Sequence, residues 1–140
     1  MRDTHSNGLG WLLDQELGSV EGVAYAVLMS SDGLLQARTE TIGQEDAEKL
    51  AALTASLRAA GKAWDEHVGG QGMCQLLIES QGRIGLTTAA ARNSMLSVVT
   101  TGPEADVGLI SHHMVRLATR LGHELEVGDR RPVPEDSTAT

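Results

Sequence analysis

The sequence predicts an α/β protein of the α+β kind, a three-layer α/β/α sandwich around a five-stranded antiparallel sheet. Two stretches, 23–29 and 95–100, are apolar on both alternating faces, so each strand needs cover on both sides. Stretches with apolar residues at steps of three and four predict the helices that supply this cover. Short turns between neighbouring strands predict hairpins, in which the strands run antiparallel. The expected order is α-β-β-α-β-β-β-α, with the central helix on one face of the sheet and the two terminal helices on the other.

The first helix is expected after a polar N-terminus, 1–8, which we predict to be flexible. Asn7 can cap this helix, and Gly18 can end it. Between them, four leucines fall on one helical face: Leu9, Leu12, Leu13 and Leu17. The helix is therefore predicted to pack its apolar side against the sheet.

The first two strands, 23–29 and 34–38, flank the turn Ser30-Ser31-Asp32-Gly33. Polar and apolar residues alternate in the second strand, which is typical of an outer strand. Asp-Gly favours a hairpin because glycine adopts a positive φ at little cost and aspartate tolerates it. No second carboxylate and no histidine stands beside Asp32 to tune it as an acid or base. We interpret Asp32 as a turn residue.

The long central helix is expected over 44–67. Six positions at steps of three and four form its predicted apolar stripe: Ala47, Leu50, Thr54, Leu57, Gly61 and Trp64. A second stripe contains small residues spaced by four: Ala51, Ala55, Ala59 and Ala63. Small side chains let another helix approach closely, but alanine is also a good helix former. Both interpretations of this alanine stripe stay open.

Three further strands are expected at 73–79, 83–88 and 95–100, joined by hairpin turns. The segment Gly102-Pro103-Glu104 is expected to open the last helix, with its proline near the first helical position. The apolar positions of this helix again step by three and four: Val107, Ile110, Met114, Leu117 and Leu121. It completes the cover that the central strands require.

The 140 residues are predicted to form one domain over 9–125, and the polar segment 126–140 is predicted to be a disordered tail. A net charge of −8 argues against nucleic acid as a partner, because phosphates attract basic surfaces. No apolar run approaches the ~20 residues of a membrane span, so no membrane insertion is expected. The single cysteine, Cys74, excludes an intrachain disulfide and fits a reducing cytoplasm.

No set of residues in the sequence predicts catalysis, a cofactor or a metal site. Cys74 alternates with apolar residues along its predicted strand, which favours a core thiol over a nucleophile. His112 and His123 share a helical face, but at the helical rise they lie ~16 Å apart, too far to bind one ion. The segment Gly70-Gln71-Gly72 precedes a strand instead of opening a helix, so it does not match a phosphate-binding loop.

Three segments, in this order, resemble the Roadblock family of dynein light-chain-like proteins. The family's opening signature resembles LGSVEGVAYAVLMSSDGLLQAR at 17–38. Its central helix resembles EDAEKLAALTASLRAAGKAW at 45–64, and its last helix resembles ADVGLISHHMVRLATRLG at 105–122. The likeness covers 9–124. It is greatest to the short bacterial branch, which some actinomycetes encode beside a sensor kinase and a small Ras-like GTPase.

The resemblance implies a homodimer in which the central helices pair and the third strands continue one sheet across a two-fold axis. The interface residues that this implies are Ala51, Ala55, Ala59, Ala63, Met73, Gln75 and Leu77. It also implies a non-catalytic, cytoplasmic regulator or scaffold that binds a small Ras-like GTPase, in a complex that can include a sensor kinase. For the GTPase contact we select four residues on the exposed side of the central helix: Arg58, Lys62, Asp65 and Glu66. The family supplies no catalytic residue, cofactor or metal ligand.

Two other functions stay open. Profilin-like and sensor sandwiches share this layered architecture, so a small-molecule-sensing module is the alternative. It predicts an enclosed pocket, and the aromatic-poor composition counts against it. A hydrolase that uses Cys74 is the third hypothesis. It predicts that Cys74→Ser abolishes an activity with little change in stability.

Overall fold

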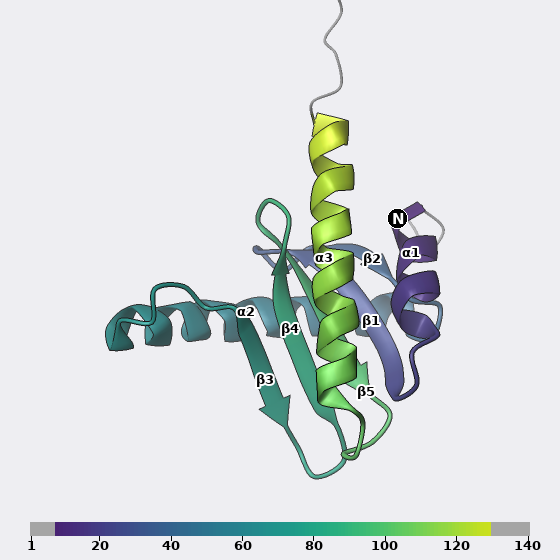
Figure 1. The fold of residues 1–140 in the computed structure, drawn as a ribbon, viewed down its shortest axis with the longest axis horizontal. Coiled ribbons are helices and arrows are strands. Elements are labelled where there is room, and N and C mark those ends of the chain that lie inside the picture. Colours follow the sequence, from purple (N-terminus) through teal and green to yellow (C-terminus); the bar gives the residue numbers. More distant parts are fainter. Residues whose placement is uncertain (1–7, 130–140) are drawn as a thin grey trace, which may run out of the picture.

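The computed structural model describes residues 8–129 of the chain (Figure 1). Most of the two segments predicted to be flexible or disordered, 1–8 and 126–140, lies outside the described residues. At both ends the folded part is longer than predicted. The first helix begins at Gly8, and the last helix continues to Asp129, past the boundary expected at 125.

All five strands belong to one antiparallel sheet, as predicted. Their bounds are Val23–Ser30 (β1), Leu35–Arg38 (β2), Gln75–Glu79 (β3), Ile84–Ala90 (β4) and Ser94–Thr100 (β5). The order across the sheet is β2-β1-β5-β4-β3. The two strands with apolar residues on both faces, β1 and β5, pair with each other in the interior of the sheet. Strands β2 and β3 are its two edges.

Helices cover both faces of this sheet, which gives the predicted three layers (Figure 1). Their bounds are Gly8–Leu13 (α1), Asp14–Gly18 (η1, a π-helical turn that continues α1), Gln44–Val68 (α2) and Val107–Asp129 (α3). Helices α1, η1 and α3 pack on one face, and α2 packs on the other. No helix among the described residues has the length and apolar character needed to cross a membrane.

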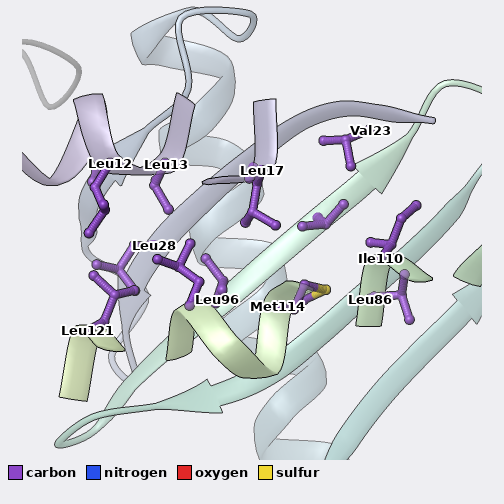
Figure 2. Close-up of a cluster of buried hydrophobic side chains, with 14 of the residues drawn as sticks. Leu12, Leu13, Leu17, Val23, Leu28, Leu86, Leu96, Ile110, Met114 and Leu121 are labelled. Carbon is purple, nitrogen blue, oxygen red and sulfur yellow. The ribbon is translucent and has the colours of Figure 1, made fainter. Parts of the chain in front are cut away.

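The larger core lies between the sheet and the α1, η1 and α3 helices (Figure 2). It contains Leu12, Leu13, Leu17, Leu28, Leu86, Leu96, Ile110, Met114 and Leu121, among others. Full burial of such a side chain contributes about 1.5–3 kcal/mol relative to leaving it exposed. Buried residues of this core come from β1, β5 and β4. The chain's own helices therefore cover most of the width of this face of the sheet.

The smaller core lies under the first half of α2. Its buried members are Val27, Met29, Ile42, Ala47, Ala51 and Met95. Among the described residues, none from β3 or β4 belongs to it. Helix α2 is therefore anchored on β1, β2 and the start of β5, and the two faces of the sheet are covered unequally.

The prediction that Gly102-Pro103-Glu104 opens the last helix is wrong, because α3 begins at Val107. The Asp106 carboxylate accepts a hydrogen bond from the Leu109 backbone N–H at 3.0 Å, so this aspartate caps the helix. Thr100 Oγ1 donates to the Gly102 carbonyl at 2.7 Å, which holds the preceding residues in a turn out of β5. A capping side chain, rather than the proline, determines where the helix starts.

The β1–β2 turn has the geometry expected of Asp-Gly. Gly33 has a φ of +87°, and its N–H donates to the Ser30 carbonyl at 2.9 Å. Asp32 is exposed in this turn. The turn also contacts α2, because a Cβ built on Gly33 would lie 3.1 Å from the Ala55 Cβ. Glycine therefore serves both the positive φ and the close approach of the helix.

Replacing Gly33 with alanine should destabilise the fold by about 1–3 kcal/mol, because alanine must adopt a positive φ and press against Ala55 at once. Urea unfolding followed by circular dichroism measures the change. Gly102→Ala is the matched control, since nothing lies within 4 Å of its added Cβ and its φ is not positive. A Gly33→Ala protein as stable as this control would contradict the account of the turn.

Candidate functional site

The second half of α2 leaves the sheet that its first half covers. Figure 1 shows the helix continuing past the edge strand β3. Of the predicted apolar stripe, Ala47 and Thr54 are buried, whereas Leu57 is exposed and Trp64 keeps 67% of its accessible surface. The predicted burial is therefore right for the first half of the helix and wrong for the second. The physical reason is that the sheet of this chain ends before the helix does.

An exposed apolar stripe, which the sequence analysis did not identify, runs along this part of the helix. Its large side chains are Leu53, Leu57, Trp64 and Val68. Spacings of four and seven place neighbouring members on one flank of the helix. The signal in the sequence was that α2 carries more apolar positions than one helical face can bury.

The alanine stripe is divided between the chain's own fold and the solvent. Ala51 is fully buried in the smaller core, and Ala55 packs against the Gly33 turn. The chain's own hairpin approaches both positions closely, which favours a small side chain at each. Ala59 and Ala63 are exposed and remain available.

Strand β3 is an open edge, since it pairs with β4 alone. Leu77, in the middle of this strand, keeps 47% of its accessible surface. The other predicted interface residues near it also contact their own chain. Met73 packs on α2 at Gly61, where an added Cβ would lie 2.6 Å from the Met73 Sδ. Gln75 Nε2 donates to Ser111 Oγ of α3 at 2.9 Å.

The hydrogen-bonding pattern determines which peptide groups of β3 point outward. The Ser80 N–H donates to the Arg83 carbonyl at 2.8 Å across the β3–β4 turn. Hydrogen-bonded pairs alternate along an antiparallel ladder, so the peptide groups of Ile78 also face β4. The alternate residues direct their N–H and C=O groups away from the sheet: Gln75, Leu77 and Glu79.

An apolar groove of about 220 Å³, the Leu57 groove, lies beside this edge between α2 and the sheet. Its apolar walls include Leu50, Leu53 and Leu57 from α2 and Leu76 and Ile78 from β3. Thr87 and Ser97 also line it, and their hydroxyls hydrogen-bond to each other at 3.0 Å. This groove is the part of the sheet face that α2 leaves uncovered.

A second groove, the Met73 groove, has a volume of about 560 Å³ and is partly open to solvent. All four residues selected for a partner contact line it: Arg58, Lys62, Asp65 and Glu66. The loop after α2, Gln75 at the start of β3, the end of β4 and Met95 supply the rest of its lining. At 3.6 residues per turn, Leu53 and Lys62 fall on opposite sides of the helix. The two grooves therefore flank α2.

Asp65 differs from the other three selected residues because it is buried and organises the loop after α2. Its carboxylate accepts a hydrogen bond from the Gly72 N–H at 2.9 Å, and its carbonyl accepts one from the Gly70 N–H at 2.9 Å. Gly69 ends the helix in the left-handed conformation. Asp65 thus holds the α2–β3 loop, whereas Lys62 and Glu66 are exposed and Arg58 is half-buried.

The part of the chain that the structure describes contains no group of three or more histidine, cysteine or acidic side chains that could hold a metal ion. The rings of His112 and His113 pack edge to face, with centroids 5.9 Å apart. Cys74 is exposed, so the prediction of a core thiol is wrong. It directly precedes β3, which is exposed along most of its length, so alternation with apolar neighbours does not imply burial there.

The chain matches the family model described as the Roadblock/LC7 domain over residues 9–100. A solved Roadblock/LC7 domain from Streptomyces avermitilis is 26% identical, with a TM-score of 0.77, over 83% of this chain and 96% of that one. Another from the same organism is 30% identical, with a TM-score of 0.66, over 80% and 96%. The family predicted from the sequence is confirmed.

More distant structures share the fold. The gliding protein MglB of Thermus thermophilus is 20% identical, with a TM-score of 0.70, over 81% of this chain and 85% of MglB. A comparison with curated proteins gives no match.

Replacing Asp65 with alanine should loosen the α2–β3 loop and lower stability by about 1–3 kcal/mol, because the Gly72 N–H loses its acceptor. Amide hydrogen exchange is the measurement, and it should accelerate at Gly70 and Gly72 but not in β1 or β5. Glu66→Ala, at the exposed neighbouring position, is the control. Unchanged exchange at Gly72 in Asp65→Ala would show that the carboxylate does not hold the loop.

Proposed function

Since the chain belongs to the Roadblock/LC7 domain family, we propose that it is a non-catalytic homodimeric regulator or scaffold that binds a small Ras-like GTPase in a bacterial signalling complex. The observation that carries this proposal is the uncovered surface formed by the second half of α2 and the β3 edge. An open strand edge beside an apolar groove is typical of a protein–protein interface. Cytoplasmic location and a sensor kinase in the same complex are part of the proposal.

The proposed dimer joins the β3 edges of two copies in antiparallel pairing. A two-fold axis at Leu77 places Leu77 opposite its own copy and Gln75 opposite the partner's Glu79. All outward peptide groups of the edge then find partners, and the two glutamates do not face each other. The alternation of peptide groups along β3 supports this register over one shifted by a single residue.

The same axis brings the α2 helices of the two copies side by side over the joined sheet. Leu53 and Leu57 of one copy then enter the Leu57 groove of the other. Their burial contributes up to about 1.5–3 kcal/mol for each side chain. In this arrangement Leu53 and Leu57 of the exposed apolar stripe form the contact between the helices, and Ala51 and Ala55 pack within each chain.

The GTPase contact is proposed on the second half of α2, through Arg58, Lys62 and Glu66. Asp65 supports this surface by holding the loop beside it. A regulator without chemistry of its own acts by shifting the populations of the GTPase switch loops or by positioning the GTPase's own catalytic groups.

Leu77→Pro should convert the dimer into a folded monomer. Proline lacks only the N–H that points to the free edge, so no hydrogen bond to β4 is lost, whereas edge pairing is blocked. Light scattering after size-exclusion chromatography measures the mass, and circular dichroism measures the fold. Leu77→Ala keeps the N–H and should remain dimeric. A monomeric wild-type chain, or a Leu77→Pro variant that stays dimeric, would refute the proposed axis.

A small Ras-like GTPase encoded near this chain should bind it in at least one nucleotide state. Calorimetry with GDP and with a non-hydrolysable GTP analogue measures the affinity. Reversing two charges, Arg58→Glu with Lys62→Glu, should weaken binding about tenfold or more, equivalent to about 1.4 kcal/mol. Lys49→Glu reverses an exposed charge in the first half of α2 and is the control. Absence of binding in both nucleotide states would overturn the proposed function.

A further inference from the structure

We infer that the Met73 groove is a binding site for a small amphipathic anion, of the class of medium-chain carboxylates. Its volume of about 560 Å³ falls within the roughly 300–1,000 Å³ typical of small-molecule sites. Met73 and Ala89 supply apolar surface for the body of such a ligand, and the buried Met95 lies beneath them. Since the groove is partly open, unlike the enclosed pocket expected of a sensing module, an elongated molecule can enter it from the side.

Three of the four neutral hydroxyl and amide side chains that line the groove are already engaged within the chain, all but the exposed Gln71. Thr87 Oγ1 donates to Ser97 Oγ at 3.0 Å, and Thr88 Oγ1 donates to the Cys74 carbonyl at 3.3 Å. Gln75 is bonded to α3, and Asp65 to the loop, as described above. Because these side chains already have hydrogen-bond partners, polar groups on a ligand would gain little by contacting them. The body of the ligand is therefore expected to be apolar.

Arg58 and Lys62 are the cationic side chains of the lining. They lie one helical turn apart on the same flank of α2, and neither forms a hydrogen bond or ion pair with another described residue. Arg58 is half-buried, and a guanidinium with no counterion among the described residues favours an anion beside it. Glu66 lies one turn further along, so the anionic head group is assigned to the Arg58 end of the groove.

The site lies apart from the leucine contacts of the proposed dimer and overlaps the proposed GTPase contact. The groove lies across α2 from the Leu57 groove, so Leu53 and Leu57 of the proposed dimer do not cover it. Gln75 lines the groove and also belongs to the proposed β3 edge. It shares Arg58 and Lys62 with the proposed GTPase contact, and a bound anion would compete with that contact. Binding of the anion itself requires no GTPase.

The exposed thiol of Cys74 lines the groove and reports its occupancy. Octanoate is the probe, and the rate of Cys74 alkylation by iodoacetamide, followed by mass spectrometry, is the readout. At about three times the Kd of octanoate, the rate should fall about fourfold, because only the unoccupied fraction reacts. Octanol and acetate at the same concentration, which supply only the apolar body or only the charge, should protect the thiol far less.

Arg58→Gln with Lys62→Gln should abolish protection by octanoate, whereas Lys49→Gln, outside the groove, should leave it intact. Each comparison uses the ratio of rates with and without octanoate in one variant, which cancels changes in the thiol's own reactivity. No protection, equal protection by octanol, or protection that survives Arg58→Gln with Lys62→Gln would each overturn the site. Because no GTPase is present, none of these outcomes bears on the proposed function.

Discussion

A single helix cannot cover one face of a five-stranded sheet, and this constraint shapes the rest of the molecule. On one face, α1, η1 and α3 together bury apolar side chains from β1 to β4. On the other, α2 buries Val27, Met29 and Met95, and it leaves a groove beside β3 and β4. A sheet needs cover on both faces to exclude water from its apolar residues. The surfaces assigned to assembly and partner binding are the ones where the chain lacks cover of its own.

Two glycines position α2 so that its second half is free. Gly33 lets the β1–β2 turn approach Ala55, and Gly61 lets Met73 pack against the helix from the start of β3. The helix contacts the rest of the chain at these two glycines and over the smaller core, which lies under its first half. Beyond Gly61, Trp64 and Val68 are exposed to solvent. Asp65 holds the loop that connects the end of α2 to the edge strand β3.

The layers, strand order and face of each helix were predictable because they follow from local patterns, such as the double apolar faces of β1 and β5. The candidate site was less predictable, because burial depends on where the sheet ends. Periodicity marked Leu57 and Trp64 as apolar positions but carried no information on the width of the sheet beneath them. The same limit misplaced Cys74 in the core. Lys62 and Arg58, selected from the sequence for a partner contact, line the Met73 groove, whereas the role of Asp65 needed the loop geometry.

The proposed function depends on a β3 edge that is completed by a second copy centred on Leu77. Hydrogen exchange at the Leu77 amide tests it directly, because this N–H points away from β4 and is protected only if a second strand pairs with it. At high protein concentration we expect slow exchange at Leu77, and dilution below the dimer Kd should restore fast exchange. Ile78, whose peptide groups face β4, should stay protected at both concentrations. Fast exchange at Leu77 at every concentration, with Ile78 protected, would contradict the account.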